Sequence, residues 1–153
     1  MAYVGSSSSF DYKKVVCIDS DFATQLKETD SGCIFVIDAD VAASAAAIYY
    51  LPKASETNVG CTYKFVLDAS PANVIDVDRH TDDDDNIFGC INSAEAAGEG
   101  ATCDSTAQET VRFAAAAVKG DSFELTLLGN GTDKWWQLSG DANDAVHIAV
   151  AAS

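Results

Sequence analysis

The sequence is poor in positive charge and in long apolar runs. Lys and Arg occupy 9 of its 153 positions against 24 for Asp and Glu, which gives a formal net charge of -15. Phosphate backbones and anionic lipid surfaces repel such a chain, so we expect neither a nucleic-acid partner nor a membrane partner. No run approaches the roughly 20 apolar residues of a membrane-spanning helix. The first residues also lack the basic start and apolar run of a secretion signal, so we expect synthesis and folding in a cytoplasm.

The five cysteines are irregularly spaced. Their number is odd and no two form a Cys-x-x-Cys pair, so the spacing indicates neither a closed disulfide framework nor a zinc ribbon. Cys33 and Cys61 fall within apolar segments and are expected in the core. We therefore predict buried thiols and no cofactor.

The remaining composition predicts one folded domain. Hydrophobic residues make up 48% of the chain, and a chain of this length buries roughly two thirds of its extended surface. We expect residues 1–13 to form an N-terminal arm and residues 14–153 a single domain. In the arm, Phe10 and Tyr12 are candidate anchors on a neighbouring subunit; the alternative is a frayed terminus.

Short apolar segments separated by turn residues predict strands. Tyr63, Phe65 and Leu67 share one face of a predicted strand, with Thr62 and Lys64 on the other. A second period-two segment, residues 123–127, precedes the hairpin signal Asn130-Gly131. A glycine at position 89 indicates a bulge, and residues 94–109 are expected to form a long surface loop. The spacing predicts an all-β, jelly-roll-like antiparallel β-sandwich of about eight or nine strands with an extended N-terminal arm.

Six carboxylates lie within the segment 76–86, which includes Asp82, Asp83, Asp84 and Asp85. Oxygen-rich clusters of this kind can bind calcium, which takes six to eight oxygen ligands. The spacing does not match an EF-hand, which has an invariant Gly and a closing Glu. The four consecutive aspartates are thus weak calcium candidates, and the alternative is a solvated acidic loop.

Trp135 and Trp136 are candidate interface or sugar-stacking residues. Neighbouring side chains of a strand point to opposite faces, so one ring should enter the core and the other should be exposed. The exposed ring is more often an interface anchor than a ligand platform.

Two short motifs suggest a hydrolase. Gly120-Asp121-Ser122 and Asp144-Ala-Val-His147 resemble the nucleophile and Asp-x-x-His blocks of a serine hydrolase family. In that family the serine precedes a helix in a parallel α/β sheet, whereas here the blocks lie on a hairpin turn and a late strand, where His147 should face solvent. We therefore predict no enzymatic activity.

The order of elements from Ile34 to Val150 resembles the small all-β structural proteins of tailed bacteriophages, in particular capsid decoration (cement) proteins. A related pattern occurs in tail and head fibre modules. The resemblance covers about three quarters of the chain and is carried by turn and strand signals. They are Ile48-Tyr-Tyr-Leu-Pro52, Gly60-x-x-Tyr63-Lys-Phe-Val66, Ile87-Phe-Gly89, Val111-x-Phe113, Gly120-Asp121-x-x-Glu124-Leu125, Gly131 and the Trp pair. The acidic insert, the cysteines and a longer first 30 residues depart from it.

The resemblance implies a jelly-roll-like sandwich, usually trimeric, on the outer face of a capsid. The expected function is that of a structural virion protein that binds the major capsid protein of a viral shell and stabilises the phage head. The alternative is a fibre or appendage module that binds a receptor or carbohydrate.

Overall fold

The computed structural model describes residues 14–18, 24–38, 41–43, 45–82, 85–93 and 101–151, with the backbone alone for 101–107. The expected arm, with Phe10 and Tyr12, lies outside these residues. The described part of the chain forms strands and one 3-10 helix, Glu28–Asp30. No helix in it is long and apolar enough to cross a membrane.

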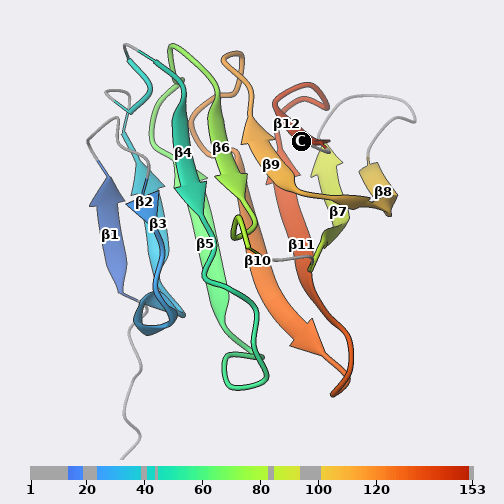
Figure 1. Cartoon of the computed structure of the whole chain (residues 1–153). Coiled ribbons are helices and arrows are strands. Elements are labelled where there is room, and N and C mark those ends of the chain that lie inside the picture. The colour runs from blue at the N-terminus through green and yellow to red at the C-terminus, as the bar shows by residue number, and fades with distance from the viewer. Residues whose placement is uncertain are drawn as a thin grey trace, which may run out of the picture.

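The strands form two facing sheets (Figure 1). Sheet A has the spatial order β1 (Val15–Ile18), β3 (Ile34–Ile37), β5 (Thr62–Leu67), β10 (Ser122–Gly129), β11 (Lys134–Ala142), β7 (Ile87–Ser93) and β8 (Ala101–Gln108). Sheet B has the order β12 (Ile148–Ala151), β9 (Thr110–Phe113), β6 (Ile75–Asp78), β4 (Ala47–Tyr50) and β2 (Thr24–Gln25). The predicted all-β sandwich is confirmed.

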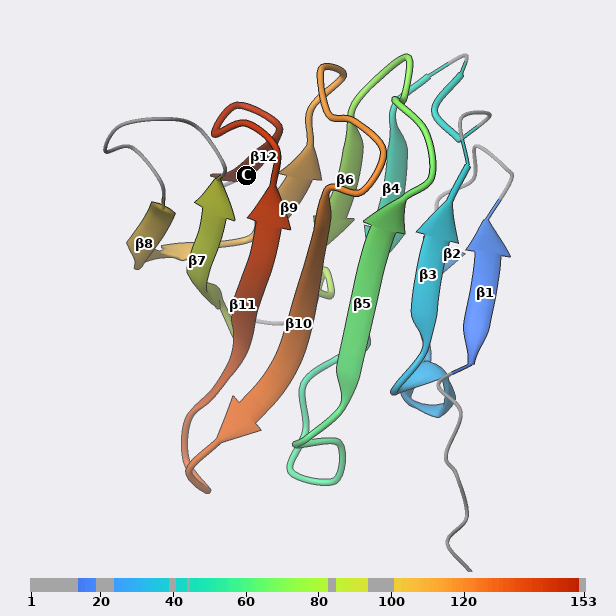
Figure 2. The ribbon, with the colours of Figure 1, turned by 180° about the vertical axis from the view of Figure 1, so that it is seen from behind.

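The sheets are mixed, which corrects the antiparallel, jelly-roll-like order expected from the sequence. Five of the ten strand pairings among the described residues are parallel. From β1 to β6 the chain alternates between the two sheets, so that each strand returns to its sheet in the same direction (Figure 2). A parallel pair needs a crossover connection, usually a helix; here a strand of the opposite sheet provides it.

The strand count is also higher than predicted. The described residues contain twelve strands, and the predicted surface loop 94–109 contains one of them, β8. That strand consists mostly of small and polar residues, and it pairs with β7 in antiparallel fashion. Strand formation of this kind depends on a neighbour rather than on intrinsic propensity, which is why the local sequence did not indicate it.

Aromatic side chains form the centre of the core between the sheets. Phe35, Phe65 and Phe123 lie in one row across β3, β5 and β10, with ring centroids 5.3 Å and 5.2 Å apart. Phe113 from sheet B lies 4.7 Å from Phe123. Such ring pairs add about 0.5–1.5 kcal/mol each beyond the burial of their area. This row therefore ties the two sheets together.

Two predicted local features are confirmed. The pairing of β7 with β8 shifts register between Ile87 and Gly89, which is the predicted bulge. At the β10–β11 hairpin, Gly131 has a φ of 93°, and the Asn130 side-chain oxygen accepts the Asp133 N–H at 2.9 Å. The Asn-Gly pair therefore provides the turn that the sequence indicated.

Candidate functional site

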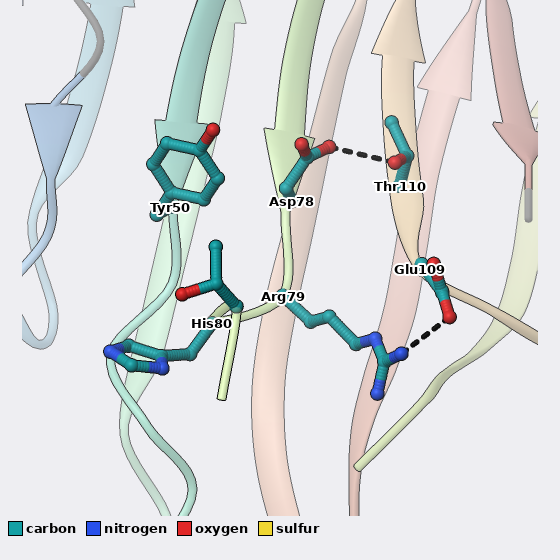
Figure 3. A pocket seen from close by; sticks show the side chains of 7 residues that line it. Tyr50, Asp78, Arg79, His80, Glu109 and Thr110 are labelled. Atoms are coloured by element: carbon teal, nitrogen blue, oxygen red, sulfur yellow. Dashed lines mark hydrogen bonds and ion pairs between the residues drawn. The ribbon is translucent and has the colours of Figure 1, made fainter. Parts of the chain in front are cut away.

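A polar hollow of about 290 Å³ lies over the outer side of sheet B (Figure 3). Its residues come from the ends of β4 and β6 and the start of β9, with the segments that follow β6 and precede β9. They are Tyr50, Asp78, Arg79, His80, Thr81, Glu109 and Thr110.

Strand alternation places these side chains outside the core. In β6, Ile75 and Val77 are fully buried between the sheets, so Asp76 and Asp78 point to the outer side. The pairing register aligns Tyr50 of β4 with Asp78, and Asp78 with Thr110 of β9. Three residues far apart in sequence thus form one row.

The charged groups of the hollow are partly paired within it. Thr110 Oγ1 donates to Asp78 Oδ1 at 2.7 Å, and Arg79 forms an ion pair with Glu109. Burial of Asp78 raises its pKa above the ordinary value of 3.8, and the neighbouring carboxylate of Asp76 adds to the effect.

A bidentate ion pair lies one row further along the same face. Arg112 Nε and Nη2 donate to the two carboxylate oxygens of Asp76 at 2.6 Å and 2.7 Å. The hydrogen bond to Asp76 raises the pKa of Arg112 and keeps it charged. This pair joins β6 to β9 and forms a rigid base beside the hollow.

The outer face of sheet A has a second distinctive surface, the apolar face of β1, β3 and β5. Val15 is 58% exposed, and the register aligns it with Ile34, and Val36 with Val66. None of the outward positions of these three strands carries a carboxylate, although Asp and Glu occupy 24 of the 153 positions of the chain. These outward residues are Val15, Cys17, Ile34, Val36, Thr62, Lys64 and Val66.

The hydrolase motifs do not assemble into a triad. His147 is buried, not exposed as predicted, and its Nδ1 lies 2.8 Å from Asp121 Oδ2. The prediction was wrong because residues 145–147 form a turn before β12 begins at Ile148, so His147 does not take part in the alternation of the strand. Asp144 instead accepts the Val146 N–H at 3.0 Å, and no hydrogen bond joins Ser122 to His147 in the described structure.

The acidic run does not form a metal site in the part of the chain that is described. Asp83 and Asp84 lie outside that part, and no group of three or more His, Cys, Asp or Glu side chains within it could hold an ion. Asp82 is exposed, and its N–H donates to His80 Nδ1 at 3.1 Å. Asp85 is half-buried.

The tryptophan pair divides between the two faces of β11, as predicted. Trp136 is fully buried, with its ring centroid 5.8 Å from that of Tyr63. It is therefore a core residue and no longer an interface candidate. Trp135 is half-buried on the outer face of sheet A and keeps that role as a prediction.

Not all of the cysteines are free thiols, contrary to the prediction from the sequence. Cys90 of β7 is disulfide-bonded, and the residue opposite it in β8 is Cys103. Cys17, Cys33 and Cys61 are free, and Cys33 is buried in the core as predicted. The odd number of cysteines and their irregular spacing gave no sign of this bond.

No model of a known protein family and no curated protein sequence matches this chain.

The sequence did not indicate the hollow, because Tyr50, Asp78 and Thr110 belong to three separate strands. The sequence does show a polar residue next to an apolar one at each of these strand ends, which indicates outward-facing polar side chains. It does not show which strands are neighbours.

Proposed function

We propose that this protein is a structural component of a bacteriophage particle, a capsid decoration protein that binds the outer surface of the head as a homotrimer. The observation that carries the proposal is the apolar, carboxylate-free face of β1, β3 and β5. A chain with a net charge of -15 repels its own copies and other acidic proteins. Adhesion is therefore most favourable where apolar side chains are exposed and acidic ones are missing.

The mechanism requires no bond chemistry. A protein that binds only the assembled shell stabilises that shell by mass action. A trimer that contacts several shell subunits at once gains avidity, so modest contacts per subunit give firm attachment. The two-sheet core, with its row of aromatic rings, supplies a rigid body for such a clamp.

Co-sedimentation with purified, expanded heads of the phage that encodes the chain tests this proposal. Wild-type protein should bind in a saturable manner, and Val15→Asp should reduce occupancy at least tenfold because it places a carboxylate on the apolar face. Val146→Asp is the matched control, since Val146 is 65% exposed and lies on the turn before β12. Absence of saturable binding, or equal loss in both variants, would contradict the proposal.

A fibre or appendage module that binds a receptor or carbohydrate is the second proposal. The half-buried ring of Trp135 on the outer face of sheet A favours it. Such a module would sit at the end of a fibre, so it would not cover the head in many copies. Saturation of heads at one trimer per repeated shell position therefore favours decoration, and a few copies per particle favours the appendage.

A further inference from the structure

Several polar groups that face the hollow on sheet B keep hydrogen-bonding capacity. Asp78 Oδ2 has no protein partner within the described residues, whereas Oδ1 accepts from Thr110. The hydroxyl groups of Tyr50 and Thr81 also have none there. His80 Nδ1 accepts the Asp82 N–H, which leaves Nε2 as the ring nitrogen that donates from the neutral imidazole.

This combination of groups favours a neutral ligand that both donates and accepts hydrogen bonds. Arg79 is already paired with Glu109, so the hollow offers an anionic ligand no unpaired guanidinium. The Asp78 carboxylate and the net charge of -15 repel phosphate, sulfate and carboxylate groups. A metal ion lacks the necessary ligand set among the described side chains. Sugar hydroxyl groups, each a donor and an acceptor, match the available partners.

The size of the hollow agrees with a small ligand. Its volume of about 290 Å³ lies just below the roughly 300–1,000 Å³ of pockets that hold drug-sized ligands. Figure 3 shows the half-buried Tyr50 ring nearly face-on beside Asp78, with His80 below it. An aromatic face presented in this way can stack against the apolar face of a pyranose ring.

We propose that the hollow formed by Tyr50, Asp78, His80 and Thr110 binds one ring of a neutral saccharide, stacked on Tyr50 and hydrogen-bonded to Asp78 and His80. The proposal goes beyond attachment to a shell. It concerns the outer side of sheet B, whereas the proposed adhesive surface belongs to sheet A. A decorated head would therefore leave this site available to sugars.

Titration of the isolated protein by amide NMR tests the proposal, because shifts report weak binding and also show whether each variant is folded. The probes are glucose, galactose, mannose and N-acetylglucosamine, with N-acetylneuraminic acid as the charged comparison. At least one neutral sugar should give saturable shifts at Tyr50, Asp78 and Thr110. The charged sugar should bind more weakly.

Variants distinguish the two residues that could stack against a sugar ring, Tyr50 on sheet B and Trp135 on sheet A. Tyr50→Ala should lower affinity at least tenfold, and Tyr50→Phe, which keeps the ring, should lower it only a few-fold. Trp135→Ala removes the rival stacking residue on sheet A, and Phe88→Ala, which removes another half-buried ring of that sheet, is the matched aromatic control that should leave affinity unchanged. No saturable shift up to the solubility of each neutral sugar would overturn the proposal. Tighter binding of the acidic sugar, or loss of binding in Trp135→Ala with retention in Tyr50→Ala, would also overturn it.

Discussion

His147 Nδ1 lies 2.8 Å from Asp121 Oδ2, with both side chains buried. Asp121 also accepts two backbone hydrogen bonds, from the Val118 N–H at 2.8 Å and from the Asn143 N–H at 2.7 Å. One carboxylate thus joins the loop before β10 to the turn before β12. One residue from each of the two hydrolase-like motifs therefore forms a structural link between two connections.

Asp121→Ala should lower the free energy of unfolding by about 3–5 kcal/mol, because it leaves a buried imidazole and two N–H groups without their partner. Urea denaturation measures the change. Asp144→Ala is the control, since the Asp144 side chain accepts one hydrogen bond within the described part of the chain, from the Val146 N–H; it should cost about 1 kcal/mol. Similar losses in both variants would show that Asp121 is not the link.

Gly89→Ala should destabilise the protein by about 3 kcal/mol or more. A Cβ atom at this position would lie 2.0 Å from the carbonyl oxygen of Leu138 in β11, and the φ of 147° is also unfavourable for alanine. Thermal unfolding compares it with Gly120→Ala, where φ is 97° but the surroundings are open. That control should cost about 1–2 kcal/mol. An equal shift of the melting temperature in the two variants would contradict the close packing of β7 on β11.

Cys90→Ser should lower stability by about 2–4 kcal/mol, because the disulfide restricts the unfolded chain. Cys17→Ser changes an exposed free thiol and should stay within about 0.5 kcal/mol of wild type. Thiol titration of the denatured, unreduced wild-type chain should detect three of the five cysteines. Five reactive thiols would show that the bond is not formed.

Asp78→Asn should raise stability slightly at neutral pH, by less than about 1 kcal/mol because the group is only half-buried. The folded state raises the pKa of Asp78, so it disfavours the ionised form. The resulting cost is present above the folded pKa and disappears as the pH falls below the ordinary value of 3.8. The gain from asparagine should therefore vanish in acid.

Unfolding experiments across this pH range should include Asp82→Asn as the control. That variant removes the same charge from an exposed side chain, so it corrects for the change in net charge. A loss of stability in Asp78→Asn at neutral pH would show that the carboxylate is stabilising.

The sequence predicted strands where side-chain alternation was strong. Tyr63, Phe65 and Leu67 are buried on one side of β5, as their spacing indicated. The bulge at Gly89 and the division of the tryptophan pair were predictable for the same reason, since each follows from local backbone geometry.

Strand neighbours could not be predicted, because parallel and antiparallel partners impose the same alternation. Three features depend on which strands pair. They are the alternation of β1 to β6 between the two sheets, the disulfide at Cys90 and the row formed by Tyr50, Asp78 and Thr110. His147 was assigned to the wrong environment because its turn interrupts the period-two pattern that Ile148 and Val150 continue. Burial of such a residue depends on the carboxylate of Asp121, 26 positions earlier.

Electron microscopy of purified phage particles tests the central claim most directly. The proposal predicts repeated trimeric density on the outside of the head, with the outer face of β1, β3 and β5 buried against shell subunits or other copies and with sheet B turned to solvent. A head surface without this density, or copies bound with that apolar face fully exposed, would contradict it.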